Sequence, residues 1–210
     1  MSLWSDWVVQ PLMDKALDTE KVRALRRELL ADAYGAILEI GFGSGLSIGC
    51  YPDHVHGIVA VDPSPGRRTR AAPRIAASGR TVRYESLGAE RLPFDDASFD
   101  TVVSEFTLCS IDSADRALAE VRRVLLPGGR LLFLEHGLAP DPGVQRWQRW
   151  LNPIQRRVAE GCQLVKEPAR LIEDAGFRID HQRSFYFEET PRILAWFTLG
   201  RAWREGPQPG

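Results

Sequence analysis

The stretch at residues 38–45, which reads LEIGFGSG, constrains the fold of this chain more than any other feature. The apolar run at 36–40 predicts a β-strand, and the acidic residue Glu39 lies near its end. Three glycines follow it: Gly41, Gly43 and Gly45. Glycine has no Cβ, so the backbone can take unusual dihedral angles and lie directly against a bulky ligand. The stretch therefore predicts a cofactor-binding turn after the first strand of an α/β fold.

A second acidic residue, Asp62, indicates which kind of cofactor this turn binds. Asp62 ends the apolar run at 58–61, and an acid at the end of a second strand can accept both hydroxyls of a ribose. Leu46 stands where a dinucleotide fingerprint needs a small residue, and no basic residue follows the turn before Arg67. This pattern favours S-adenosylmethionine, which has a ribose but no phosphate, over NAD. An NAD-dependent reductase is the alternative.

The rest of the chain alternates strand-like and helix-like segments. Strands are expected at 36–40, 58–61, 82–86, 101–104 and 130–135, with helices between them. This alternation predicts a doubly wound, mostly parallel sheet with helices on both faces, to which late β-like runs at 177–180 and 184–187 add an antiparallel edge, making seven strands. Ligands bind at the carboxyl ends of such strands. The residues expected at that edge are 39–45, 62–64, 88–90, 104–110 and 135–137.

Bulk properties describe one domain spanning residues 1–210, long enough for a full α/β core. A net charge of −1 gives no general attraction to nucleic acid. The sequence shows no signal peptide and no run of about 20 apolar residues that could span a membrane, so a cytoplasmic location is expected. The tail at 204–210 is expected to be flexible, because it is rich in proline and glycine. The oligomeric state cannot be read from the sequence.

The cysteines and histidines give no metal-binding pattern. Cys50, Cys109 and Cys162 have no paired spacing, which fits a reducing compartment. His54 and His56 lie near Cys50, but such a short loop is more typical of solvated side chains, so no metal is assigned. We interpret Cys109 and Cys162 as packing residues rather than nucleophiles, since free cysteines are often buried and inert.

The N-terminal segment at 1–33 is expected to be helical. Its first dozen residues place Trp4, Trp7 and Leu12 at helical spacing, and a second helix is expected from residue 18 or 19 to residue 33. The apolar stripe has three interpretations: it packs on its own domain, it forms a lid over the substrate, or it contacts a membrane surface. Membrane-surface helices usually carry basic residues on the polar face, and none precedes Lys15, so membrane association is not favoured.

These motifs together resemble the class I S-adenosylmethionine-dependent methyltransferases over about residues 34–190. The segment LEIGFGSG is similar to their first motif, VDPS at 61–64 to their second, and GAERLPF at 88–94 with SFD at 98–100 to the loop beside the adenine. The helix containing VRRVL at 121–125 and the turn PGG at 127–129 are similar to the region before their fifth strand.

The resemblance implies a role for each matching residue. Glycines 41, 43 and 45 approach the methionyl end of the cofactor, and the carboxylate of Glu39 helps to orient that end. Asp62 holds the ribose hydroxyls, and Pro63 flanks the adenine. Ala89 and Glu90 match the adenine loop, in which Gly88 replaces the aspartate of many relatives, and Ser104 faces the reactive part of the cofactor. The implied cofactor-binding set is Glu39, Gly41, Gly43, Gly45, Asp62, Pro63, Ala89, Glu90 and Ser104.

Within that superfamily, the segments TLCS at 107–110, EH at 135–136 and GCQL at 161–164, with the stretch at 147–153, resemble the methyltransferase-like thiol S-methyltransferases and their bacterial relatives. The animal enzymes begin with a hydrophobic membrane segment, which this chain replaces with residues 4–12. The resemblance implies methylation of a small hydrophobic thiol, a small-molecule acceptor. A phospholipid N-methyltransferase or a quinone C-methyltransferase is the nearest alternative, and a protein that binds the cofactor without turnover is another.

The expected chemistry requires few catalytic groups. Methyl transfer from a sulfonium is a direct displacement, so alignment of the reactants and exclusion of water are the main tasks. His136, just after the fifth strand, is the candidate general base, since an imidazole can accept the thiol proton; a structural hydrogen-bonding role is the alternative. The candidate walls of the acceptor pocket are Trp4, Trp7, Trp147 and Trp150.

Overall fold

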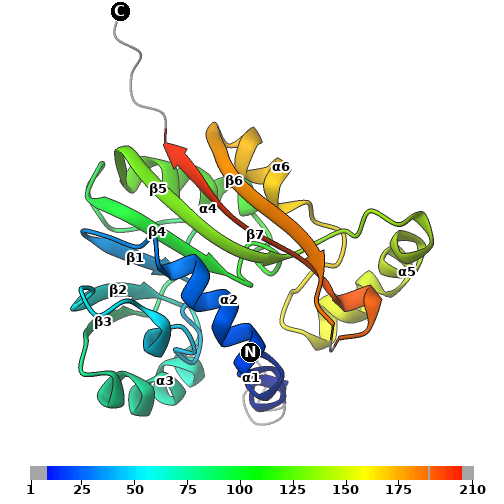
Figure 1. Cartoon of the computed structure of the whole chain (residues 1–210), viewed down its shortest axis with the longest axis horizontal. Helices are drawn as coiled ribbons and strands as arrows, with labels where there is room; N and C mark the ends of the chain where they lie inside the picture. The colour runs from blue at the N-terminus through cyan, green and yellow to red at the C-terminus, as the bar shows by residue number, and fades with distance from the viewer. Residues whose placement is uncertain (1–8, 189, 205–210) are drawn as a thin grey trace, which may run out of the picture.

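A computed structural model describes residues 9–188 and 190–204 of the chain. A seven-stranded sheet runs through the molecule in the order β3-β2-β1-β4-β5-β7-β6 (Figure 1). The strands are β1 (Ile37–Ile40), β2 (Gly57–Val61), β3 (Thr81–Glu85), β4 (Phe99–Glu105), β5 (Leu125–His136), β6 (Phe177–Tyr186) and β7 (Trp196–Arg204). Strands β1 to β5 are parallel, as the alternating pattern predicts. The predicted fold class is confirmed.

Helices cover both faces of the sheet. The helices are α1 (Gln10–Leu17), α2 (Glu20–Leu30), α3 (Pro65–Ser78), α4 (Ala114–Val124), α5 (Pro142–Val158) and α6 (Pro168–Asp174), with short 3-10 turns at Ile48–Cys50 and Arg192–Leu194. Apolar side chains of α2 and α3 pack on one face, and those of α4 and α6 on the other. Because the central strands are buried on both faces, they read as continuous apolar runs in the sequence.

The far side of the sheet differs in detail from the sequence prediction. The two late β-like runs are one strand, β6, with a register shift between Ile179 and His181. The antiparallel strand is β7, which lies between β5 and β6, so β6 rather than the antiparallel strand forms the edge. Gly200 explains the tight fit of β7: a Cβ there would lie 2.5 Å from the Phe133 ring of β5.

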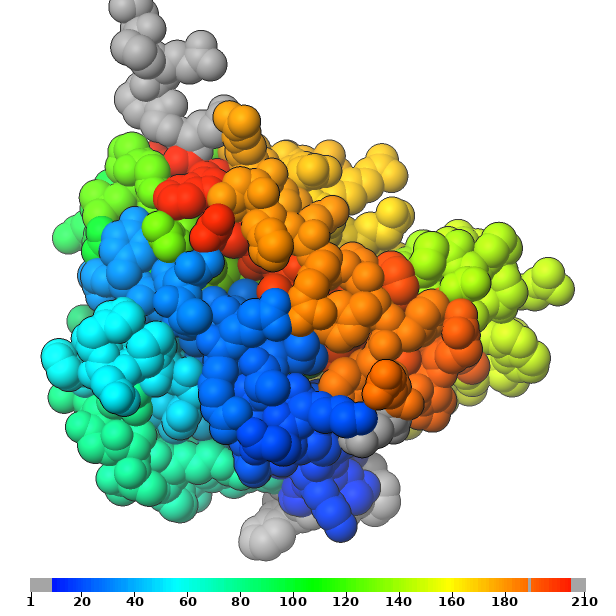
Figure 2. All heavy atoms as spheres, viewed as in Figure 1, coloured from blue at the N-terminus to red at the C-terminus, as the bar shows by residue number. Residues whose placement is uncertain are grey.

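Helix α5 is an element, like β7, that the sequence pattern did not indicate. The pair at 152–153 reads as a helix break, yet α5 continues through Pro153. Proline removes one backbone donor and crowds the preceding turn, but Pro153 lies on the solvent side, where water can satisfy the freed carbonyl. The same holds for Pro73 in α3. Helix α5 packs on the turn at Arg192–Leu194 and projects from the body of the molecule (Figures 1 and 2).

Candidate active site

A cavity of about 900 Å³ opens at the carboxyl ends of β1, β2 and β4. Its floor is formed by the turns that follow these strands, and further walls come from α1 and from the last turn of α5. Several residues of the predicted cofactor set line it: Glu39, Gly41, Gly43, Asp62, Pro63, Ala89 and Glu90. The cavity is of the size that proteins use for cofactors and small ligands.

The three glycines of the turn have three different surroundings. All have positive φ, which favours glycine. A Cβ on Gly41 would overlap the Thr107 side chain at 2.0 Å, so this position keeps the turn against the loop after β4. Gly45 packs against the Phe42 ring and is not among the described residues that line the cavity. Gly43 faces open space, since a Cβ there would have Gly41 O as its nearest neighbour, at 3.7 Å. Gly43 is therefore the glycine whose missing side chain leaves room for a ligand.

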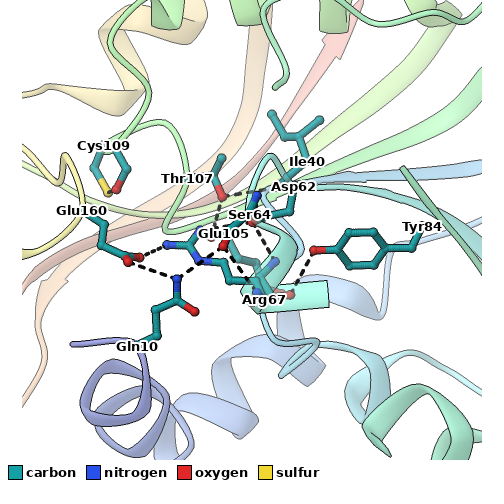
Figure 3. Close-up of polar contacts among 12 residues, drawn as sticks. Gln10, Ile40, Asp62, Ser64, Arg67, Tyr84, Glu105, Thr107, Cys109 and Glu160 are labelled. Atoms are coloured by element: carbon teal, nitrogen blue, oxygen red, sulfur yellow. Dashed lines mark hydrogen bonds and ion pairs between the residues drawn. The ribbon is translucent and has the colours of Figure 1, made fainter. Parts of the chain in front are cut away.

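Asp62 lies at the centre of a polar cluster at the end of β2 (Figure 3). Its Oδ1 accepts the backbone N–H of Ser64 at 2.9 Å, and its Oδ2 accepts the backbone N–H of Gly43 at 3.1 Å. The Arg67 guanidinium, at the start of α3, donates to the same Oδ2 at 3.1 Å and also to Glu160. The carboxylate is fully buried and held in a fixed orientation. A ribose that binds Asp62 must share this carboxylate with Arg67.

Two buried carboxylates, Glu39 and Glu105, line the cavity beyond Asp62. Glu39 accepts hydrogen bonds from the hydroxyls of Ser47 and Tyr51, each at 2.7 Å at its shortest. Burial and the charge of Glu105 raise the pKa of Glu39 to about 8. Glu105 Oε2 accepts from the buried Arg26 guanidinium at 2.7 Å, whereas its Oε1 has no hydrogen-bond partner among the described residues. Burial raises the pKa of Glu105 above its usual range in spite of Arg26.

Ser104 and Glu135 support the site from behind its lining. Ser104, at the end of β4, is fully buried and donates its hydroxyl to Glu135 Oε1 at 2.7 Å. The same carboxylate accepts the backbone N–H groups of Thr107, Leu108 and Cys109. Glu135 thereby fixes the loop that carries the cavity-lining residues after β4. Ser104 is not among the described residues that line the cavity, and its hydroxyl is engaged in this support.

The predicted catalytic residue and two of the predicted acceptor residues are not part of the described cavity lining. The His136 ring is 5% exposed, and its Nδ1 is 3.8 Å from Cys162 Sγ. Trp147 and Trp150 are 55% and 65% exposed on the outer face of α5, in edge contact with each other. None of these three is among the described residues that line the cavity. The prediction that Trp147 and Trp150 form a wall of the acceptor pocket therefore differs from the structure. Trp4 and Trp7 lie outside the described residues.

The N-terminal segment contributes to the site through α1. Val9, Met13 and Leu17 present apolar side chains to the cavity, opposite Val158 and Ala159 at the end of α5. Gln10 is buried and donates to Glu160 at 3.1 Å, so the two walls meet through this contact (Figure 3). Among the described residues, the apolar part of this lining is therefore built from aliphatic and thioether side chains.

The sequence assigned no individual role to four polar residues that come from separate elements. Arg26, Arg67, Glu105 and Glu160 all line the cavity and form two ion pairs, Arg26 with Glu105 and Arg67 with Glu160. Glu105 lies within the range 104–110 that was expected at the ligand-binding edge, and its position at a strand end is the signal that could have singled it out. The arginines carried no signal, since basic residues on helices are usually solvated.

The residues that line the cavity suit the polar and charged groups of S-adenosylmethionine. Gly43 leaves space beside Asp62, whose carboxylate suits a ribose diol. The free oxygen of Glu105 and the carboxyl of Glu39 suit a ligand that carries positive charge, as the ammonium and sulfonium of this cofactor do. A doubly wound sheet with such a site at its switch point defines the class of α/β proteins that bind a nucleoside-containing cofactor.

Comparisons with known proteins narrow this class to one family. A family model described as a methyltransferase domain matches residues 38–133. The chain is 31% identical over 193 residues to the human thiol S-methyltransferase TMT1B, an alignment that covers 86% of this chain and 76% of the relative. It is 33% identical to a demethylmenaquinone methyltransferase of Thermobifida fusca, over 66% of this chain and 61% of that protein. Among solved structures, the [4+2]-cyclase SpnF superposes with a TM-score of 0.71 at 19% identity, covering 91% of this chain and 82% of SpnF, which shows a shared fold.

The chain belongs to the class I S-adenosylmethionine-dependent methyltransferase family. It is an enzyme of that family, and S-adenosylmethionine is its cofactor. Within residues 9–188 and 190–204, no helix is both long and apolar enough to cross a bilayer. In the same part of the chain, no group of three histidine, cysteine or acidic side chains is arranged to hold a metal ion.

Proposed function

We propose that this enzyme methylates the sulfur of a small hydrophobic thiol. The observation that carries the proposal is the mixed character of the cavity lining: it has the buried carboxylates of Glu39, Asp62 and Glu105, and the helices α1 and α5 add apolar side chains such as Met13 and Val158 among polar ones. The similarity to TMT1B, which is named a thiol S-methyltransferase, extends over 86% of the chain and supports this acceptor class.

When bound, S-adenosylmethionine supplies a methyl group on a positively charged sulfur. The residues of this chain then have two tasks. Glu39, Asp62 and Glu105 hold the polar parts of the cofactor in one orientation, and Val9, Met13 and Val158 give the acceptor an apolar contact surface. Alignment of this kind supplies much of the rate enhancement in a direct displacement. The acceptor sulfur forms a bond to the methyl carbon as the bond to the cofactor sulfur breaks, so a covalent enzyme intermediate is unnecessary.

The thiol proton can leave without a dedicated base, or His136 can accept it. A thiol with a pKa of about 8.5 is ionised to roughly 3% at pH 7. A base role for His136 predicts that His136→Asn lowers kcat about 100-fold at pH 7 and less at pH 9, where the thiol ionises unaided. If His136→Asn lowers kcat only slightly, and equally at both pH values, His136 has a structural role in its contact with Cys162 instead.

The acceptor class is tested by release of S-adenosylhomocysteine, measured by mass spectrometry. Purified enzyme is incubated with alkyl and aryl thiols, and the matched alcohols serve as controls that differ only in the accepting atom. We expect product with the thiols, increasing with the apolar size of the acceptor, and none with the alcohols. Turnover with a quinol or with phosphatidylethanolamine vesicles, and none with any thiol, would reject the proposal.

A quinol C-methyltransferase is the second candidate function, and one observation favours it. Helix α5 exposes an apolar stripe flanked by exposed arginines: Trp147, Trp150, Ile154 and Val158, with Arg146, Arg149, Arg156 and Arg157. Basic amphipathic helices with tryptophan on the apolar face are typical of membrane surfaces, where lipophilic quinols reside. The relative from Thermobifida fusca is named a demethylmenaquinone methyltransferase.

This second candidate is tested by co-sedimentation with vesicles that contain anionic phospholipid. A quinol acceptor predicts binding that the double substitution Trp147→Ser with Trp150→Ser removes, together with turnover of quinol in those vesicles. Arg170→Ser, at an exposed position on α6, is the matched control. Absence of binding, with thiol turnover intact, would leave only the thiol candidate.

A further inference from the structure

A second cluster of reactive side chains lies next to the cavity. Cys109, in the loop after β4, and Cys162, after α5, place their sulfur atoms 3.7 Å apart. His136, the last residue of β5, points its Nδ1 at Cys162 Sγ from 3.8 Å. Both cysteines are free thiols, and all three side chains are buried. The methyl transfer proposed above does not use either sulfur.

The two cysteine-bearing segments are held together by their backbones. The Gln163 N–H donates to the Cys109 carbonyl at 2.9 Å. Gly161 packs so closely that a Cβ there would lie 2.8 Å from the Ser110 carbonyl oxygen. Because the main chains are already adjacent, the sulfurs can reach bonding distance through small side-chain rotations. Disulfides require this kind of prior backbone proximity.

The surroundings distinguish the two sulfurs. His136 Nε2 is buried and has no hydrogen-bond partner among the described residues, so Cys162 is the polar group that its imidazole faces. Hydrogen bonds from Cys109 and His136 lower the pKa of Cys162, whereas the pKa of Cys109 is raised, first by its hydrogen bond with Cys162 and then by burial. The thiolate is the reactive form of cysteine. Packing alone would not require an imidazole aimed at the sulfur.

We propose that Cys162 and Cys109 are a peroxide-oxidisable dithiol that closes to a disulfide at the rim of the cofactor cavity. The Cys162 sulfur attacks one peroxide oxygen and the O–O bond breaks. The hydroxide that leaves takes up the proton of the Cys162 thiol and becomes water. Cys162 is then a sulfenic acid. The Cys109 sulfur attacks it, the S–O bond breaks, and a second water leaves with the Cys109 proton. Two thiols have lost two electrons, which have reduced one hydrogen peroxide to two waters.

The position of this disulfide connects it to the methyltransferase site. Ser110 and Ile111 follow Cys109 and line the cavity, and Glu160 and Gly161 precede Cys162 and also line it. Glu160 pairs with Arg67, which donates to Asp62. A bond between the sulfurs would therefore fix the two rims of the cavity to each other and restrain the partner of the ribose-binding carboxylate. This inference does not depend on the identity of the methyl acceptor.

The test is oxidation of the purified enzyme by hydrogen peroxide, followed by peptide mapping without reductant. We expect a cross-linked peptide pair containing Cys109 and Cys162, lost on addition of dithiothreitol. Cys50 is the matched internal control, because it and Cys162 are both 8% exposed, yet burial raises the pKa of Cys50. We expect Cys162 to react at least about tenfold faster than Cys50, since access is equal and only thiolate character differs.

Variants separate chemistry from folding. Cys109→Ser should leave a sulfenic acid on Cys162 that dimedone traps, and His136→Asn should slow the oxidation of Cys162 at neutral pH. Cys50→Ser should change neither result. The proposal fails if Cys162 and Cys50 react at the same rate in the folded enzyme. It also fails if the cross-link forms only after denaturant is added, because the folded geometry would then play no part.

Discussion

At the scale of single residues, the site depends on carboxylates in three different electrostatic settings. Asp62 is neutralised by Arg67 and backbone donors, Glu105 is half satisfied by Arg26, and Glu39 is buried among hydroxyl donors. A cationic ligand would stabilise the charged forms of Glu105 and Glu39, because it brings a positive charge next to these buried carboxylates. Cofactor binding should therefore be coupled to protonation.

The coupling gives a pH prediction for Glu39. Its pKa of about 8 means that the free enzyme holds a proton there at neutral pH, whereas a bound ammonium favours the carboxylate. Binding then releases this proton, so affinity should rise with pH, by at most about tenfold per unit. Titration calorimetry between pH 6 and pH 7.5, where an α-amino group of pKa about 7.7–8.0 stays largely protonated, measures the effect. Glu39→Gln should reduce the slope to the part that Glu105 contributes, and an unchanged slope in that variant would contradict the assignment.

Asp62 gives a prediction on affinity alone. Hydrogen bonds to a charged group contribute about 1.5–3 kcal/mol each, so loss of both ribose contacts in Asp62→Ala should weaken cofactor binding at least about 100-fold. Calorimetry measures the affinity, and circular dichroism verifies the fold. Arg68→Ala is the control, since Arg68 is the exposed neighbour of Arg67 on α3. Equal affinity in Asp62→Ala and wild type would mean that the ribose binds elsewhere.

At the scale of elements, the turn after β1 separates a structural from a ligand-facing glycine. Gly41→Ala would overlap Thr107 and strain a positive φ, so we expect a loss of unfolding free energy of about 2–4 kcal/mol. Gly43→Ala strains its φ without a close contact and should cost about 1–2 kcal/mol. The methyl group of Gly43→Ala enters the cavity. The loss in the free energy of cofactor binding should therefore be larger than the loss in the free energy of unfolding. Denaturant unfolding and calorimetry on both variants test the contrast, and equal stability losses would contradict it.

A strand or helix was predictable from the sequence where its own residues show a clear apolar pattern. The parallel strands and α4 follow from apolar runs and a stripe such as Leu118 with Val121, which packing on one side produces. Strand β7 was missed, because Gly200 and Arg201 interrupt its apolar run. Helix α5 was missed because proline at 153 reads as a stop. The strand-end position of Asp62 was predictable, but the further pairing of its partner Arg67 with Glu160 was not, since Arg67 and Glu160 belong to elements far apart in the sequence.

At the scale of the whole molecule, Arg26 ties the N-terminal helices to the site. It is a fully buried charged residue of α2, and it donates to Glu105 on β4 and to the Leu17 carbonyl at the end of α1, both at 2.7 Å. The wall that α1 gives to the cavity is therefore linked to the sheet by one side chain. A buried ion pair is costly to break from one side.

This arrangement predicts that Arg26→Met lowers the free energy of unfolding by about 3–5 kcal/mol, since it leaves Glu105 buried without its partner. The double variant Arg26→Met with Glu105→Gln should recover part of that loss, because no uncompensated charge remains. Denaturant unfolding monitored by tryptophan fluorescence measures both. A double variant that is less stable than the single one would show that the two side chains act independently.

The insertion of β7 between β5 and β6 has a consequence for biosynthesis. Strand β5 leaves the ribosome with one side unpaired, and its partner β7 begins about sixty residues later. At about 5–20 residues per second, that interval lasts roughly 3–12 s. During this time the apolar edge of β5 is open to pairing with another nascent chain. Slow translation between β5 and β7 should therefore raise the demand of this enzyme for chaperones, whatever the stability of the finished fold.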